Sequence, residues 1–263
     1  MRFSVLGSGS RGNCVYIESG YSAILIDAGF SGKEIANRLA IIDRDIGSVD
    51  AIFLTHEHHD HICGVGVVSR RCKIPVYANE GTFQGADKRL KKLFKRDEFQ
   101  TGDSIAFNDF HIRSFAVSHD TNDPVGFIVG NGRSSLGFCT DTGIVSRLIG
   151  HRLEGCNALI LEFNHDPDLL MNGPYPPALK QRVRSNQGHL SNGDAACLLD
   201  TLIHERLQRI VLAHLSETNN LPALAYGEAV GAVRSRLDEN ILDISQPDKP
   251  TSLFEISECG PHF

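Results

Sequence analysis

The sequence predicts an α/β fold built as one large domain. A chain of 263 residues can bury about three quarters of the surface that it exposes when unfolded. Short apolar runs have the length of buried strands, and helix candidates separate them. The clearest runs are Ala51 to Leu54, Asn157 to Glu162 and Arg209 to Ala213. Polar residues follow each run, at the strand edge where α/β folds form their sites. We therefore expect one domain over residues 1–250 and a C-terminal tail over 251–263.

The composition disfavours several classes of protein. The 26 Lys and Arg against 32 Asp and Glu give a formal charge of −6, so any anionic substrate must be met by a local cluster of cations or metals. No apolar run approaches the length that spans a membrane. Seven cysteines without a Cys-x-x-Cys pair favour reduced thiols over a disulfide framework. We expect a soluble protein in the cytoplasm.

The first strands frame a loop rich in glycine and serine. Strands are expected over 2–6, 15–18 and 23–26, and the loop covers 7–13. Glycine lets a backbone approach a ligand closely, so Ser8 and Asn13 are candidate substrate-binding residues; the alternative is a simple turn. Asp27 ends the third strand, where it would emerge at the same sheet edge as the later histidines or cap a helix over 31–39.

The apolar run over 51–54 leads into the stretch Thr55-His56-Glu57-His58-His59-Asp60-His61. So many imidazoles and carboxylates cannot be buried without partners or a metal. His56 and His58 are spaced to chelate one ion, while Asp60 and His61 are adjacent and can turn toward a second. A His-Glu-x-x-His helix would need histidines four residues apart, which is not the pattern here. The stretch therefore predicts a metal site; the alternative is a solvated, histidine-rich turn.

A basic segment and a hairpin mark the middle of the chain. After a helix over 62–72 and a strand over 75–78, six cations within residues 88–96 predict an amphipathic basic helix. This helix could hold a phosphate backbone or could simply present a solvated face. Asn131-Gly132 predicts a hairpin between strands over 125–129 and 136–138. His119 and Asp141 each follow a predicted strand.

Further candidates follow the later strands. The strand over 157–162 ends in Glu162, and a basic segment over 180–184 comes after it. His189 precedes a helix over 193–204 that Ser191 or Asn192 would cap. The strand over 209–213 delivers His214 to the sheet edge. A helix over 222–237 and a strand over 241–244 complete the predicted domain.

The motif His56-x-His58-x-Asp60-His61 after a short apolar strand resembles the signature of the metallo-β-lactamase-fold hydrolases. The resemblance implies a four-layer αββα sandwich with two divalent metal ions at one edge. It implies that the first ion is held by His56, His58, His119 and Asp141, and the second by Asp60, His61, Asp141 and His214. Asp27 would orient the ligands from behind. The ligand types suit zinc or manganese, and iron is a further option.

Two residues differ from the patterns of other branches of this family and so limit the branches to which the chain could belong. Asp141 stands where a lactam-hydrolysing member commonly carries Cys, and His58 stands where a flavodiiron protein carries Glu, so both chemistries are disfavoured. The motifs around Asn164, His189 and His214 resemble those of the YycJ/WalJ-like branch, which implies a DNA exonuclease. The alternatives are an RNA-directed phosphodiesterase, a small-molecule thioesterase of the glyoxalase II type and a metal-stabilised interaction module.

A phosphodiesterase of this kind would use a metal-bridging hydroxide as its nucleophile. Asp60 would orient that water, and His189, supported by Glu162, would protonate the leaving oxygen; the alternative is a structural bond between His189 and Glu162. The expected substrate is a 5′ end of DNA, whose backbone would follow the cations of residues 88–96 or 180–184. The residues expected to bind the strand are Ser8, Asn13, Ser216, Asn219 and Asn220. The last three could instead form a turn ahead of Pro222.

Overall fold

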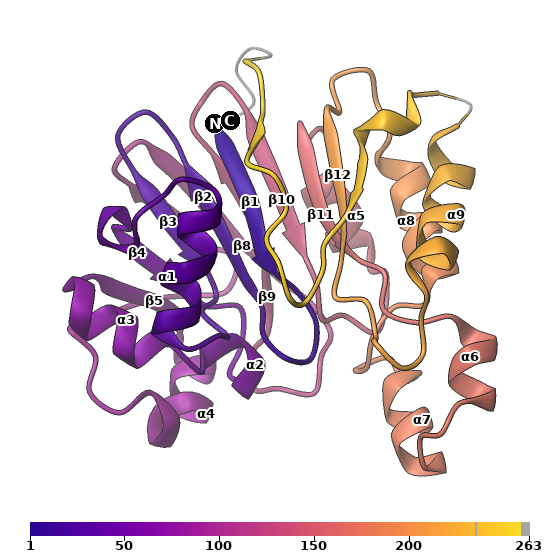
Figure 1. Ribbon diagram of the computed structural model, residues 1–263, viewed down its shortest axis with the longest axis horizontal. Helices are drawn as coiled ribbons and strands as arrows, with labels where there is room; N and C mark the ends of the chain where they lie inside the picture. The colour runs from indigo at the N-terminus through magenta and orange to yellow at the C-terminus, as the bar shows by residue number, and fades with distance from the viewer. Residues whose placement is uncertain (235, 259–263) are drawn as a thin grey trace. The chain divides into compact units, whose positions relative to one another are not determined.

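The computed structural model describes residues 1–234 and 236–258 (Figure 1). The chain divides into two compact units. The first comprises residues 1–114, 121–125 and 246–255, and the second comprises residues 115–120, 126–245 and 256–258 within the described part. That residues 1–250 form one domain stays a prediction.

The first unit contains a seven-stranded sheet in the order β14-β1-β2-β3-β4-β5-β6. Its strands are β1 (Arg2–Gly7), β2 (Cys14–Glu18), β3 (Ala23–Ile26), β4 (Ala51–Phe53), β5 (Pro75–Asn79), β6 (Lys95–Phe99) and β14 (Phe254–Glu255). Its helices are α1 (Gly32–Ile41), α2 (His59–Ile62), α3 (Val65–Cys72) and α4 (Glu80–Leu90), with a 3₁₀ turn η1 (Ile46–Ser48). β1, β2 and β3 pair antiparallel, and β3 to β6 pair in parallel, which requires the helical crossovers between them.

Helices α1, α3 and α4 cover one face of this sheet (Figure 1). Alternate strand residues such as Leu25, Ile52 and Val76 point to that face and pack with Leu39 and Val68 from the helices. The helix predicted over 62–72 is interrupted at Gly64, between α2 and α3. A Cβ atom on Gly64 would lie 2.1 Å from the carbonyl oxygen of Phe30, so the interruption depends on glycine at this position.

The second unit contains parallel strands flanked by a hairpin, in the order β13-β12-β11-β10-β9. These strands are β9 (Val125–Gly130), β10 (Ser135–Cys139), β11 (Ala158–Glu162), β12 (Arg209–Ala213) and β13 (Leu242–Ile244). The helices are α5 (Arg147–Leu153), α6 (Pro167–Asn172), α7 (Pro177–Val183), α8 (Asn192–Leu202) and α9 (Pro222–Val233), with a 3₁₀ turn η2 (Glu239–Ile241). α5, α8 and α9 pack on the apolar residues Leu159, Leu161, Ile210 and Leu212.

The predicted hairpin around Asn131 and the cap of the late helix are confirmed. β9 and β10 pair antiparallel across residues 131–134, and the Ser191 side chain accepts from the Asp194 backbone to begin α8. A further hairpin joins β7 (Ser104–Phe107) to β8 (Phe110–Ala116). Residues 115–120, which include the end of β8 and His119, belong to the second unit.

The basic helix predicted over residues 88–96 is wrong. α4 ends at Leu90, Lys91 takes a positive φ of 55°, and β6 begins at Lys95. β6 pairs residue for residue with β5, from Pro75 with Lys95 to Asn79 with Phe99. These long-range backbone hydrogen bonds determine the conformation, and charged residues are frequent on an edge strand because they discourage pairing with other chains. The cations of this segment therefore do not share one helix face.

Part of the predicted tail belongs to the first unit. β14 pairs antiparallel with β1, and the Thr251 backbone donates to the Val5 carbonyl over 3.0 Å. Residues 259–263 of the predicted tail lie outside the described residues. Among residues 1–234 and 236–258, no helix is both long and apolar enough to cross a membrane.

Candidate metal centre

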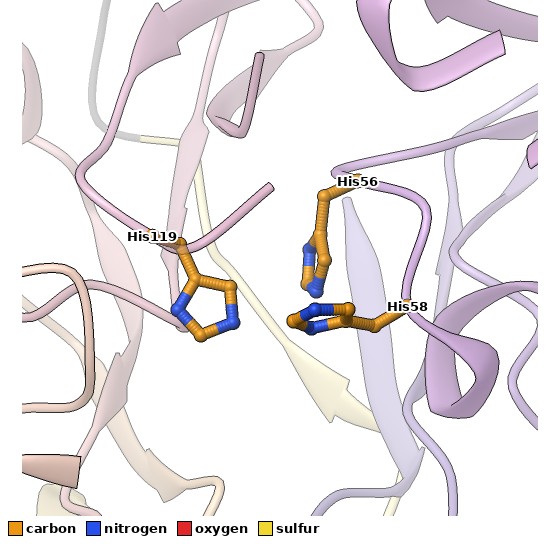
Figure 2. A group of neighbouring side chains, drawn as sticks. All are labelled: His56, His58 and His119. Atoms are coloured by element: carbon orange, nitrogen blue, oxygen red, sulfur yellow. The ribbon is translucent and has the colours of Figure 1, made fainter. Parts of the chain in front are cut away.

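The first group of candidate ligands lies in the first unit, on the loop that follows β4 and in α2. His56 and His61 are fully buried, and their ring centroids are 4.0 Å apart. The His58 ring lies at 81° to the His56 ring, with 4.8 Å between centroids. Figure 2 shows the two rings edge to face. Imidazole nitrogens this close together are the kind of ligand set that binds a divalent metal.

Asp27 orients this group through Thr55 and His61. Its Oδ1 accepts from the Thr55 backbone over 2.9 Å, and its Oδ2 accepts from the Thr55 hydroxyl over 2.8 Å and lies 2.7 Å from His61 Nδ1. Burial raises the pKa of the Asp27 carboxyl, while His61 and Thr55 act in the opposite direction. The alternative role as a helix cap is not observed, because the Ser31 side chain caps α1.

This arrangement determines which nitrogen of His61 faces a ligand. A hydrogen on Nδ1, directed at Asp27, leaves a lone pair on Nε2. The Asn13 amide nitrogen lies 3.0 Å from Nε2, which fits an acceptor there. Asn13 also donates to Asp60 Oδ2 over 3.2 Å, and its own Oδ1 accepts from the Ser8 hydroxyl over 2.9 Å. The loop over 7–13 therefore supports the metal-binding loop directly.

The second group lies in the second unit, at the carboxyl ends of its strands. Ligand atoms of Asp141, Glu162, His189 and His214 lie within 4.8 Å of one another. His214 Nδ1 is 3.2 Å from Asp141 Oδ1, and His119 Nε2 is 3.9 Å from the same oxygen. Within this unit, the residues that follow the strands therefore lie together at one edge of the sheet, as the sequence predicted.

Glu162 is the centre of the second group. Its Oε1 lies 2.7 Å from His189 Nδ1 and 3.2 Å from His214 Nδ1, and its Oε2 accepts from the Thr142 and Leu190 backbones over 3.1 Å each. Burial favours a protonated carboxyl, but the two histidines outweigh burial and hold the pKa of Glu162 well below its usual range. Glu162 is therefore a buried carboxylate at neutral pH.

His119, also labelled in Figure 2, is oriented by a backbone carbonyl. Its Nδ1 lies 3.1 Å from the Gly188 oxygen, which can only accept, so Nδ1 carries the hydrogen and Nε2 carries the lone pair. Burial lowers the pKa of His119, against the opposing effect of Asp141. A neutral imidazole whose orientation is fixed by a hydrogen bond through its other nitrogen is the form that ligates divalent metals.

The candidate substrate-binding residues near His214 make mostly internal contacts. The Asn220 amide donates to the Phe163 and Asn164 carbonyls over 2.9 and 3.0 Å, and its oxygen accepts from the Leu221 backbone. The Ser216 hydroxyl accepts from the Asn219 backbone over 3.0 Å. These contacts match the alternative of a turn ahead of Pro222.

Three groups that orient the candidate ligands were not predicted from the sequence. They are the Thr55 side chain, the Gly188 carbonyl and the backbone N–H groups that Glu162 accepts from. The position of Thr55 directly after a strand and before His56 was a usable signal. Backbone groups carry no residue-type signal, so the contacts of Gly188 and Leu190 could come only from the fold.

A family model and two curated relatives each match most of this chain. The model of a beta-lactamase superfamily domain matches residues 22–215. Exodeoxyribonuclease WalJ of Streptococcus pneumoniae is 40% identical over 265 residues, covering 97% of this chain and 98% of that protein. Exodeoxyribonuclease YycJ of Bacillus anthracis is 39% identical over 227 residues, 86% of each chain.

The solved structures show the same fold. The metallo-beta-lactamase fold protein YhfI from Bacillus subtilis superposes with a TM-score of 0.71 at 17% identity, over 95% of this chain and 99% of that one. The predicted metallo-β-lactamase fold is therefore confirmed, and with it the two sheets with their helices.

Proposed function

This chain belongs to the beta-lactamase superfamily, and we propose that it is a metal-dependent phosphodiesterase that removes nucleotides from an end of DNA. The two relatives named exodeoxyribonucleases support the substrate, because the similarity extends over most of both chains. The observation that carries the proposal is the Glu162–His189 pair beside Asp141. It adds a buried carboxylate and a half-buried imidazole to a set of metal ligands, which suits proton transfer to a leaving oxygen.

The proposed ligand assignment keeps the sets expected from the sequence. His56, His58, His119 and Asp141 would hold one divalent ion, and Asp60, His61, Asp141 and His214 the other. Two observations support the fit. Asp27 and Gly188 hold Nδ1 of His61 and of His119, so Nε2 of each ring is the nitrogen turned to a carboxylate of the set, Asp60 at 3.6 Å and Asp141 at 3.9 Å. Neutral imidazoles and carboxylates without thiolate suit zinc or manganese.

Divalent ions in such a site supply Lewis-acid activation of water and stabilise charge on the phosphorus oxygens. The protein's residues do the rest. His189 keeps one hydrogen on Nδ1 for Glu162, so the proton that reaches the leaving 3′ or 5′ oxygen departs from Nε2. Glu162 accepts that hydrogen and so fixes the orientation of the ring during the transfer. Asp60, held by the Asn13 amide, would accept a hydrogen bond from the attacking water.

The finer substrate preference is the 5′ end of a DNA strand. Lys180 lies on α7 and Arg184 at its C-terminal cap, in the second unit, and clustered cations bind phosphates irrespective of sequence. The Arg182 guanidinium already pairs with Asp120 over 2.5 Å, so it contributes less positive charge than its neighbours.

The test uses end-labelled DNA with 5′-phosphate or 5′-hydroxyl ends, together with RNA, a thioester and a β-lactam, on the zinc- and manganese-loaded protein. We expect metal-dependent release of nucleotides from DNA that is lost in Asp141→Ala and retained in His151→Ala, whose side chain is exposed on α5. Hydrolysis of the thioester in preference to DNA would overturn the proposal in favour of a small-molecule hydrolase.

A further inference from the structure

A groove of about 540 Å³ lies in the second unit beside the second ligand group. One wall is formed by Gly143, Ile144 and Val145, which directly follow Asp141 and Thr142, and the rim carries Arg184 and Asn186. This volume is within the usual range for sites that bind small molecules or parts of larger ligands.

Backbone packing fixes this groove next to the proposed chemistry. The Gly143 N–H donates to the Ser118 carbonyl over 2.8 Å. A Cβ atom on Gly143 would lie 2.3 Å from the Ser185 oxygen and 2.6 Å from the Gly188 nitrogen. The segment over 185–188 therefore packs against Gly143, and the next residue along the chain is His189. Both sides of the groove continue without interruption into residues of the second group.

The lining combines exposed aliphatic surface with hydrogen-bonding groups. Ile144 is 41% exposed and Val145 is 37% exposed. Exposing β-branched side chains in a turn does not stabilise the fold. The Asn186 amide offers a donor and an acceptor, and Arg184 offers a positive charge. Asp194 also lines the groove, where its carboxylate accepts from the Ser191 hydroxyl over 2.6 Å at the start of α8. A phosphate is therefore favoured on the Arg184 side and disfavoured on the Asp194 side.

We propose that this groove binds the base of the nucleotide next to the scissile phosphate of a DNA strand. This inference rests on the proposed function. It assigns to the groove the role of positioning the end of the DNA strand. The aliphatic wall of Ile144 and Val145 covers the face of the base, since every base has an apolar face and such contact tolerates any sequence. Asn186 reaches the hydrogen-bonding edge of the base, and Arg184 pairs with the adjacent phosphate.

The test compares the wild type with Ile144→Ala/Val145→Ala on two DNA substrates, one complete and one with an abasic site at the terminal nucleotide. We expect the wild type to lose about 5- to 10-fold in kcat/KM on the abasic substrate, the lower range for contact with one base. The variant should cut both substrates at the same reduced rate. Leu148→Ala, which removes an exposed leucine on α5 outside the groove, should behave as the wild type. Hydrolysis of bis(p-nitrophenyl) phosphate, which has no base, should be unchanged in Leu148→Ala and should fall less than DNA cleavage does in Ile144→Ala/Val145→Ala.

A binding measurement keeps the inference separate from the proposed function. Metal-loaded protein is titrated with deoxyadenosine 5′-monophosphate and with deoxyribose 5-phosphate, and the ratio of the two Kd values reports the contribution of the base. A ratio of about 5 to 10 in the wild type that falls to near 1 in the double variant supports the groove even if DNA is not cleaved. Equal ratios in both proteins would overturn it, as would an equal loss on DNA and on bis(p-nitrophenyl) phosphate.

Discussion

Replacing Glu162 by Gln should separate two roles of this side chain, which are to stabilise the fold and to orient His189. In the native protein Oε2 accepts from two backbone N–H groups, and Oε1 faces the Nδ1 atoms of His189 and His214. A Gln side chain has one oxygen and one NH₂ group. If the oxygen keeps the two backbone contacts, the NH₂ group meets two imidazole nitrogens that carried hydrogens.

The magnitude follows from these contacts. Hydrogen bonds to charged groups contribute about 1.5–3 kcal/mol each, so losing two of them costs about 3–6 kcal/mol. The neutral amide avoids the desolvation of a buried carboxylate, which offsets part of this loss. We therefore expect a loss of about 3 kcal/mol in the free energy of unfolding, out of a total of about 5–15 kcal/mol for a protein of ordinary stability.

Urea unfolding in the presence of a chelator measures this loss without contributions from bound metal. Glu154→Gln is the matched control, because that side chain is 74% exposed and pairs with the exposed His151. An unchanged midpoint for Glu162→Gln would refute the reasoning, since it would mean that the four contacts stabilise nothing.

Activity on two substrates tests the second role of Glu162, which is to orient His189. If Glu162 orients His189 for proton transfer, Glu162→Gln and His189→Ala should both lower cleavage of DNA by about 10²- to 10⁴-fold, the range for general-acid catalysis. Bis(p-nitrophenyl) phosphate releases a stable phenolate that needs no proton, so its hydrolysis should fall far less. An equal fall on both substrates would assign Glu162 and His189 to metal binding or structure.

Three further predictions concern the first unit. Asp27→Asn should weaken metal binding about 10- to 100-fold, because His61 loses its charged partner; unchanged affinity in a metal titration would contradict this role. Gly29→Ala should destabilise the fold by about 1–3 kcal/mol, since its Cβ would lie 1.7 Å from the Asp60 oxygen. Gly20→Ala, with nothing within 4 Å, is the control, and equal melting temperatures would argue against the clash. Burial favours protonation of Glu18, but Arg44 and Tyr16 outweigh it and hold its pKa below the usual value of 4.5. Its stabilising effect should therefore be fully present above about pH 4.5 and decrease as pH falls from there through the lower folded value, so the urea midpoints of Glu18→Gln and wild type should differ at pH 7 and approach each other as the pH is lowered below 4.5. A difference that does not change with pH would rule out the charge as its origin.

The sequence could predict the strands and the residues that follow them because both signals are local. Apolar runs such as Ala51–Phe53 and Arg209–Ala213 end where the structure ends them, within one residue. Ser31 and Ser191 cap the helices expected after them. Asp141 and His214 could be proposed as neighbours because carboxyl ends of parallel strands share one edge.

The segment over 88–96 could not be predicted in the same way. Leu90, Leu93 and Phe94 have a helical spacing, and the sequence carries no trace of the β5 backbone that pairs with Lys95 to Phe99. Arg96 instead stacks 4.0 Å from the centre of the Phe83 ring, an interaction between elements that only the fold brings together. The orienting contacts of Thr55 and Gly188 were missed for the same reason, since they too join residues distant in the sequence.

The backbone at the strand ends explains how these sites are held in place. Asp27, Asp141 and His214 each follow a strand and each adopt a positive φ, at 60°, 57° and 56°. Asp tolerates this region better than most residues, yet each such position costs about 1–3 kcal/mol and persists only where other contacts enforce it. Asp27 has three such contacts, two to Thr55 and one to His61. The chain turns at these residues, which brings Asp141 and His214 into the candidate ligand groups and sets Asp27 against Thr55 and His61. Glycine would remove the strain at each position but would also remove the carboxylate or imidazole, so the strained conformation persists where the side chain is needed.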